Sequence, residues 1–319
     1  MLVWRSLEDV DPAFGPSVVT IGVFDGVHRG HRALLRRARD VAHEQSTPGY
    51  DVPVVAVTFD PHPLAVLAPD REPARLTAME QRARLLAVAG ARRVLVLPFD
   101  AAMSTWSPQE FVQRVVVDAL DAAAVVVGES FRFGHRAAGD VPLLRELGQR
   151  HGFSVEGLGL AGDQQPWSST YVRQCLTEGD VEEAARVLGR WFSIEGVVVR
   201  GDQRGRRLGY PTANVPTPAR AAVPDDGVYA GFLRRLDEPM ASMLPAAVSV
   251  GTNPTFNGVD HRVESYVLDR DDLELYDVAV EVSFVRRLRG QVRFDDVDAL
   301  VEQMRFDCDT ARAVLAAAA

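Results

Sequence analysis

The pattern of apolar and polar positions divides the chain near residue 190. In the first part, short apolar runs alternate with longer segments in which apolar residues recur every three or four positions. This alternation of strands and helices predicts a mainly parallel sheet with helices on both faces. The predicted strands are residues 18–24, 53–59, 93–98, 124–128 and 153–158, and the predicted helices are residues 32–42, 77–89, 107–120 and 141–151.

The second part has a different pattern, in which predicted strands follow one another without helices between them. It comes after a short helix that is capped by Asp180 and ends near Leu188. From Val278 to Phe284, apolar residues alternate with small or polar ones, as in a half-buried strand. Consecutive strands favour an antiparallel barrel. The predicted strands are residues 194–200, 227–233, 246–250, 261–268 and 276–285, and a final helix begins near Asp296.

The change of pattern predicts two domains, residues 1–188 and 189–319, which suits a chain of 319 residues. Composition narrows the class of protein further. Hydrophobic residues make up 47% and charged residues 25% of the chain, as in an ordinary globular protein. The net charge of −9 argues against a nucleic-acid-binding protein of the usual basic kind.

Three further features of composition bear on location and chemistry. We find neither a secretory signal nor an apolar run of about eighteen residues, so we expect a cytoplasmic protein without a membrane partner. Cys175 and Cys308 lie in unrelated contexts, which favours a reducing compartment over a disulfide framework. All 35 basic residues are arginine, which excludes a Walker A loop because that loop requires a lysine.

The first predicted strand leads through a glycine-rich turn into a helix, and His28 and His31 lie at this junction. The free backbone N–H groups at the start of a helix favour phosphate. Imidazoles at this place can donate hydrogen bonds to phosphate oxygens or to a pyrophosphate leaving group. Two alternatives are a metal site, to which only Asp25 nearby would contribute, and simple capping of the helix. The glycines after a strand favour the phosphate site.

Three more segments follow predicted strands, where ligands of parallel sheets bind. Asp60 and His62 are candidates for contact with nucleotide or metal, and the alternative is a rigid turn. The segment from Gly128 to Gly134 contains Phe131, Arg132 and Phe133, which would hold an aromatic or phosphate-bearing ligand; the alternative is an aromatic-anchored loop. The hydroxyls of Ser168, Ser169 and Thr170 with the guanidinium of Arg173 would clamp a triphosphate, and the alternative is an ordinary capped helix.

The second part contains one glycine-rich segment with polar residues at its end. Gly201, Gly205 and Gly209 predict a mobile loop, and Pro211 stiffens the backbone after it. Thr212 and Asn214 are two residues apart in an extended segment, so they project to one side. Their hydroxyl and amide oxygens suit Mg²⁺. The alternative is a glycine-rich hairpin stiffened by proline.

Glu264 shares a predicted strand face with Tyr266 and Leu268. A carboxylate on an otherwise apolar face is either paired or functional. Partial burial would raise its pKa and make it a better base.

These motifs resemble known families. The segment Gly22 to His31 resembles the HxGH signature of Rossmann-like nucleotidyltransferases and, over its full length, bacterial FAD synthetase. The resemblance implies nucleotide contacts from Gly22, Phe24, Asp25 and Gly26. It is complete at Ser168, Ser169, Thr170 and Arg173, and it departs from the family pattern at Ser130, where Asn or Asp is usual.

The segment Pro211 to Asn214 resembles the PTAN motif of riboflavin kinases, whose fold is a small antiparallel β-barrel with a C-terminal helix. Residues 224–230, 250–256 and 263–269 agree with that family, and Asn253 lies in the second of these segments. The resemblance places the catalytic base on Glu264. It places Arg289 and Arg305 in segments that close over the flavin.

The resemblance covers nearly the whole chain and implies a bifunctional enzyme. The C-terminal domain would phosphorylate riboflavin to FMN with ATP and Mg²⁺, releasing ADP. The N-terminal domain would adenylylate FMN to FAD and release pyrophosphate, with His28 and His31 as catalytic residues. We expect a monomer or weak homo-oligomer without a nucleic-acid partner. Two alternatives are a kinase alone, which Ser130 favours, and a flavin-binding regulator.

Overall fold

The computed structural model describes residues 2–159, 162, 167–201, 204–218, 220–238, 240–255 and 258–318. The chain forms two compact units. The first comprises Met1–Pro73 and Met79–Ser168, and the second comprises Ala74–Ala78 and Ser169–Ala319.

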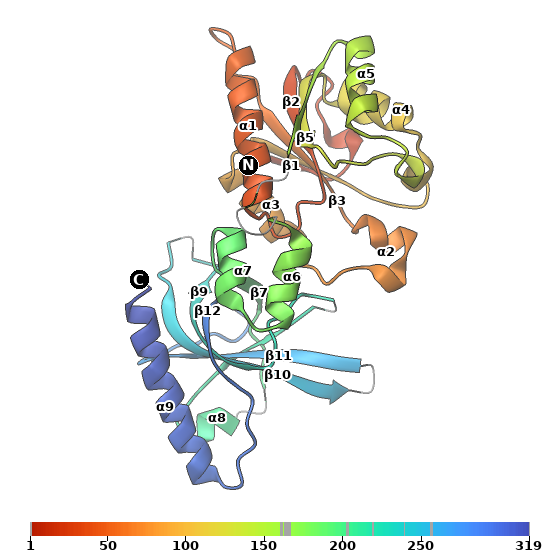
Figure 1. The fold of residues 1–319 in the computed structure, drawn as a ribbon. Coiled ribbons are helices and arrows are strands. Elements are labelled where there is room, and N and C mark those ends of the chain that lie inside the picture. Colours follow the sequence, from red (N-terminus) through yellow and green to blue (C-terminus); the bar gives the residue numbers. More distant parts are fainter. Residues whose placement is uncertain are drawn as a thin grey trace. The chain divides into compact units, whose positions relative to one another are not determined.

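The first unit is built on a six-stranded parallel sheet in the order β1-β4-β3-β2-β5-β6. Figure 1 labels β1, β2, β3 and β5 of this sheet. Strand β2 is central, with β3 on one side and β5 on the other, so the strand order reverses there. At such a point the loops leaving the strands diverge and open a crevice for a ligand. The strands are β1 (Leu2–Trp4), β2 (Ser17–Ile21), β3 (Val54–Phe59), β4 (Arg93–Leu97), β5 (Ala122–Gly128) and β6 (Ser154–Leu158).

Helices cover both faces of this sheet, as the apolar pattern predicts. They are α1 (Arg29–Gln45), α2 (Pro63–Leu67), α3 (Met79–Val88), α4 (Pro108–Phe111) with a π-helical continuation Val112–Ala119, and α5 (Val141–His151).

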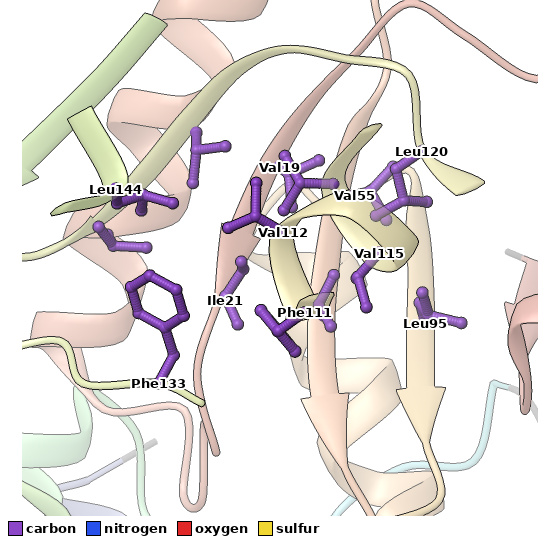
Figure 2. Close-up of a cluster of buried hydrophobic side chains, with 14 of the residues drawn as sticks. Val19, Ile21, Val55, Leu95, Phe111, Val112, Val115, Leu120, Phe133 and Leu144 are labelled. Carbon is purple, nitrogen blue, oxygen red and sulfur yellow. The ribbon is translucent and has the colours of Figure 1, made fainter. Parts of the chain in front are cut away.

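Successive residues of each buried strand face opposite helices. Val18 packs with α1 and α3, whereas Val19 and Ile21 pack with α4, its continuation and α5. Figure 2 shows the second of these clusters, with Phe111 and Val112 lying against the sheet. Burial on both faces explains why the strands are continuous apolar runs.

The second unit is a six-stranded antiparallel sheet in the order β7-β12-β9-β10-β11-β8. A bridge between Val199 and Asn214 brings its two ends together, so the barrel is nearly closed. The strands are β7 (Phe192–Val197), β8 (Ala213–Pro216), β9 (Gly227–Arg235), β10 (Leu244–Thr255), β11 (Gly258–Val267) and β12 (Ala279–Gly290).

The helices in the described part of the second unit are α6 (Ser169–Thr177), α7 (Val181–Leu188), the short α8 (Arg204–Arg207) and α9 (Val297–Ala316). Helix α7 packs against β7 and β12. Helix α9 covers β9, β10 and β12 and buries Cys308, Ala311 and Leu315 against Phe232. None of the described helices is long and apolar enough to cross a bilayer.

The structure confirms the predicted fold class, with differences at element ends. Strand β2 ends at Ile21 rather than at residue 24, because the backbone turns at Phe24. Helix α1 begins at Arg29, three residues before the predicted start, so His31 lies in its first turn. The predicted rigid turn after β3 continues into α2. Strand β1 was not predicted, because its three residues are too few to show a periodic hydrophobic pattern.

Candidate active sites

The turn after β2 holds a strained backbone in a fixed shape. Phe24 and Val27 have φ angles of 53° and 42°, a region that side chains with a Cβ rarely adopt. Two buried side chains form hydrogen bonds that fix the backbone of this turn. Thr58 Oγ1 and Arg82 Nη1 both donate to the carbonyl oxygen of Val23, at 2.9 and 3.1 Å. Strain of this kind is typical of ligand-binding turns.

Asp25, a predicted nucleotide contact, lies in the same turn and pairs with Arg82 of α3. The distance from Arg82 Nη2 to Asp25 Oδ1 is 3.3 Å, and both side chains are buried, at 6% and 3% exposure. A buried charge needs such a partner because its desolvation is costly. In this structure, the carboxylate of Asp25 is therefore part of the support beneath the turn.

His28 and His31 are brought together at the start of α1. Their rings stack at 3.6 Å between centroids, and Phe24 lies edge-on to His31 at 5.1 Å. His28 also caps the helix, since its Nδ1 accepts the backbone N–H of His31 at 3.4 Å. A Cβ at Gly30 would lie 3.0 Å from the His28 ring and 3.2 Å from the Trp167 carbonyl oxygen, so a side chain at that position would crowd its neighbours.

The surroundings of His31 favour a neutral imidazole. Burial, followed by the nearby His28 and Arg82, lowers the pKa of His31 well below its ordinary value near 6.5. Its Nδ1 is buried, and none of the residues that the structure describes forms a hydrogen bond with it. A neutral imidazole carries one N–H group. Next to the helix N–H groups, it can therefore donate one hydrogen bond to a phosphate oxygen without first becoming protonated.

The two other segments at this edge of the sheet have structural contacts as well. His62 Nδ1 accepts the backbone N–H of Leu64 at 3.0 Å and so caps α2, whereas Asp60 is exposed. The role of both residues as nucleotide or metal contacts stays a prediction, and the capping of α2 by His62 was not among the alternatives that the sequence offered.

The loop after β5 is anchored by aromatic packing. Phe133 is buried in the core and stacks on Phe131 at 5.4 Å. Arg132 pairs with Asp140 at 3.1 Å, and Ser130 is exposed. Gly134 has φ +74°, and a Cβ there would meet the backbone of α4 at 2.7 Å. Gly128 precedes this loop at the end of β5.

The predicted triphosphate clamp is divided between the two units. Ser168 is the last residue of the first unit, and Ser169 begins α6 in the second. Thr170 follows in the first turn of α6, and Arg173 Nε donates to the Ala74 carbonyl oxygen at 2.5 Å. That contact ties residues 74–78 to α6 within the second unit.

Two cavities of similar size open on the barrel of the second unit, and Thr212 lines both. The first, here called the Asn214 cavity, has a volume of about 300 Å³ and is lined by Val198, Arg200, Pro211, Thr212, Ala213, Asn214, Ser265, Val267, Arg270, Asp271, Leu273, Glu274, Leu275 and Tyr276. The second, here called the Glu264 cavity, has a volume of about 290 Å³. Its lining is formed by Gly205, Leu208, Tyr210, Thr212, Val228, Ala247, Ser249, Glu264, Tyr266, Arg289, Gln291, Val292, Phe294, Leu300, Met304, Asp307 and Cys308.

Strand register places Glu264 between two polar residues. It lies directly opposite Asn214 of β8 and Ser249 of β10. Opposite residues of antiparallel strands project to the same face with Cβ atoms about 5 Å apart. The carboxylate therefore lies beside an amide and a hydroxyl, and Thr212 lines both cavities.

Glycine at two positions lets the preceding loop approach this group. A Cβ at Gly201 would lie 2.7 Å from the Asn214 side-chain amide, and one at Gly205 would lie 2.5 Å from the Tyr210 carbonyl oxygen. Gly209 has φ +87° and needs glycine for its conformation. Asn214 Nδ2 donates to the Thr212 carbonyl oxygen at 3.3 Å and to its hydroxyl at 3.5 Å. The side chains of Thr212 and Asn214 therefore lie beside each other, and their role as metal ligands stays a prediction.

The remaining predicted residues differ in what surrounds them. Arg289 lines the Glu264 cavity, whereas Arg305 is exposed on α9 and is not part of that lining. The side chain of Asn253 lies outside what the structure describes. Sequence reasoning missed Arg82 and Asp307, because their partners are 57 and 18 residues away and neither spacing has a local signature.

Comparison with known proteins gives a consistent result for both units. The sequence profile of the FAD synthetase family matches residues 11–171, and that of the riboflavin kinase family matches residues 188–315. The chain is 38% identical to the bifunctional riboflavin kinase/FMN adenylyltransferase of Escherichia coli strain K12, over 92% of this chain and 91% of that protein. It is 38% identical to the enzyme of the same description from Pseudomonas fluorescens, over 100% and 99% of the two chains.

Among solved structures, one from Streptococcus pneumoniae, titled a macrolide-efflux protein, is 30% identical. It aligns with a TM-score of 0.85 over 98% of both chains.

Proposed function

Since this chain belongs to the family of bifunctional riboflavin kinase/FMN adenylyltransferases, we propose that its two reactions take place at the two groups of residues described above. The enzyme phosphorylates riboflavin to FMN and adenylylates FMN to FAD. We assign the kinase to residues 189–319 and the adenylyltransferase to residues 1–188.

One observation carries the kinase assignment: Thr212 lines both cavities of the barrel, and Glu264 lines one of them opposite Asn214. Two substrates held in adjoining cavities would meet at that wall. We assign riboflavin to the Glu264 cavity, whose lining is largely apolar, and ATP to the Asn214 cavity.

At the shared wall, the 5′-hydroxyl oxygen of riboflavin attacks the γ-phosphorus of ATP. The bond from that phosphorus to the β,γ-bridging oxygen breaks, and ADP leaves. Glu264 accepts the hydroxyl proton as general base, a role that contributes about 10²–10⁴-fold to such rates.

The residues beside Glu264 fit a magnesium ion. Thr212 and Asn214 supply a hydroxyl and an amide oxygen, which are hard ligands of the kind that Mg²⁺ accepts, and phosphates and water commonly complete its coordination. Among the described residues there is no cluster of three or more acidic, histidine or cysteine side chains that would compete for the ion. When bound, the ion would neutralise charge on the transferred phosphate.

For the adenylyltransferase we propose that His28 and His31 donate hydrogen bonds to the phosphates of ATP. An FMN phosphate oxygen attacks the α-phosphorus, and pyrophosphate leaves as its bond to that phosphorus breaks. The stacked imidazoles and the first N–H groups of α1 support this assignment, because all are donors at one helix start. We keep the family-implied nucleotide contacts of Ser168, Ser169, Thr170 and Arg173 as part of the proposal.

The same proposal covers ligands and assembly. We propose riboflavin, FMN, FAD, ATP, ADP and pyrophosphate as ligands of a monomer or weak homo-oligomer in the cytoplasm. Light scattering at micromolar concentration measures the assembly directly.

A reciprocal pair of variants tests the two site assignments. Glu264→Gln keeps the size of the side chain but cannot accept a proton, so kinase turnover, followed as ADP formation, should fall about 10²–10⁴-fold. FAD formation from supplied FMN should be unchanged. His28→Ala should do the reverse, because losing a donor to transition-state charge costs about 10²–10³-fold.

The melting temperature of each variant is the control for folding. Near-normal turnover of Glu264→Gln with a depressed melting temperature would show that Glu264 is only a structural partner. Near-normal FAD formation by His28→Ala would show that His28 only caps α1.

A further inference from the structure

The Glu264 cavity contains an arginine whose charge is already matched within the wall. Arg289 of β12 and Asp307 of α9 both line the cavity, and they form a bidentate pair. Arg289 Nε lies 3.0 Å from both carboxylate oxygens, and Nη2 lies 2.7 Å from Oδ2. The side chains are 20% and 7% exposed, so water screens the pair weakly.

The other hydrogen bonds of this pair are also made to groups of the protein. Arg289 Nη1 donates to the Gly290 carbonyl oxygen at 3.0 Å, and Gln303 Nε2 donates to Asp307 Oδ1 at 2.8 Å. The guanidinium lies 5.9 Å from the centre of the Phe294 ring. Arg289 is therefore held as a neutralised, packed side chain and is not positioned as a free cation.

The remaining lining leaves little other charge in the cavity. Besides Arg289 and Asp307, Glu264 is the one acidic or basic residue of the described lining. Burial raises the pKa of Tyr266 and raises the pKa of Cys308 to about 11, so both are neutral near pH 7. The charge that a ligand meets is thus set by Glu264 and by how completely Asp307 compensates Arg289.

This charge balance matters because the substrate and product of the reaction differ in charge. Riboflavin is neutral, whereas FMN carries a phosphate with a charge of about −1.5 to −2. An uncompensated arginine in the wall of the cavity would attract the charged product more than the neutral substrate. The product would then leave slowly and compete with new riboflavin.

We propose that Asp307 is a specificity-determining residue of the kinase: by neutralising Arg289, it makes the Glu264 cavity prefer neutral riboflavin over its phosphorylated product. The proposal rests on the assignment of this cavity to riboflavin. It adds a function for Asp307 that neither phosphoryl transfer nor the general base requires.

The test measures two constants on the full-length enzyme through initial rates of ADP formation. These constants are the KM for riboflavin and the inhibition constant of added FMN. ADP reports the kinase alone, since the adenylyltransferase releases pyrophosphate instead. The ratio of the FMN inhibition constant to the riboflavin KM measures preference by charge.

Three variants and one control make the result specific. Asp307→Asn keeps the shape of the side chain and frees the charge of Arg289, so the ratio should fall about tenfold. Arg289→Gln leaves Asp307 uncompensated, so the ratio should rise. The double variant has neither charge and should return the ratio to the wild-type value. Asp309→Asn, which removes a carboxylate on the same helix that pairs with Arg312, should leave the ratio unchanged.

The outcomes separate failure of this inference from failure of the cavity assignment. If riboflavin KM changes in the variants while the ratio stays constant, riboflavin binds there but Asp307 does not discriminate by charge, and the inference is overturned. A double variant that keeps the ratio of Asp307→Asn would also overturn it, because the effect would not act through Arg289. If neither constant moves in any of the three variants, the cavity does not hold the flavin.

Discussion

The imidazole of His31 lies in surroundings that oppose its protonation. Its neighbours are the His28 ring at 3.6 Å and the buried Arg82, and its own Nδ1 is buried. Each of these factors disfavours a positive charge on the ring. The residue therefore connects the stability of the first unit to pH as well as supplying a hydrogen-bond donor.

The lowered pKa of His31 predicts a pH-dependent stability with a definite sign. Below about pH 6.5 the unfolded chain binds a proton at this position more readily than the native protein does. The free energy of unfolding should therefore decrease as the pH falls from 6.5 and should be independent of this residue above that value. Urea unfolding of the wild type and His31→Gln between pH 5 and pH 8 measures the difference.

Replacing the exposed His43 on the same helix is the matched control. The pH dependence below 6.5 should be smaller in His31→Gln than in His43→Gln. Equal slopes in the two variants would contradict the assignment of the titration to His31. In His31→Gln, FAD formation should also fall about 10²-fold, as expected when a donor to a transferring phosphate is lost.

At the scale of single elements, the proposed chemistry depends on the turn after β2 and on the pairing of β8 with β11. Helix α1 follows the end of β2, with His28 as its N-cap residue and His31 in its first turn. In the barrel, β8 and β11 hold Asn214 opposite Glu264, and the loop before β8 must pass close to that pair. The approach of this loop depends on a residue without a side chain.

Gly201→Ala should impair the kinase through Asn214. The added Cβ would lie 2.7 Å from the Asn214 amide, so either the loop or the amide must move. A shift of about 1 Å at a reacting centre can cost 10²-fold in rate. We expect ADP formation to fall by about that factor, with FAD formation from FMN unchanged.

Gly290→Ala serves as the control in the same unit, because the nearest atom to its Cβ would lie at 4.0 Å. It should retain most kinase activity. If Gly201→Ala is as active as Gly290→Ala, the position of Asn214 is not important for the reaction.

At the scale of the whole molecule, the division by compactness and the division predicted by pattern differ by two helices. Helices α6 and α7 belong to the second compact unit, and α7 packs against β7 and β12. Val181, Ala184, Val187 and Leu188 are the buried residues of α7. The functional boundary at 188/189 stays a prediction, and fragments can test it.

Fragments beginning at residue 169 and at residue 189 should both phosphorylate riboflavin and make no FAD. The longer fragment should melt at a higher temperature, since burying one aliphatic side chain contributes about 1.5–3 kcal/mol. Thermal unfolding and product chromatography on both fragments give the answer. A folded shorter fragment without kinase activity would show that α6 and α7 belong to the kinase.

The sequence alone determined the fold class and most of the candidate residues. The spacing of apolar residues along the chain shows which face of each helix or strand is buried, because residues that recur with the period of the element lie on the same face. Residues such as His28 and Thr212 could be found because they lie directly beside the strand or turn that positions them. Strand-end chemistry is local, so a local pattern predicts it.

Only the tertiary structure decided which distant residues meet. Asp25 pairs with Arg82, Glu264 lies between Asn214 and Ser249, and Arg289 is neutralised by a residue of α9. These contacts arise from helix packing and strand register, which depend on the burial of whole surfaces together. No local sequence pattern indicates these contacts. The charge of each site and the residues shared by the two cavities could therefore be seen only in the folded structure.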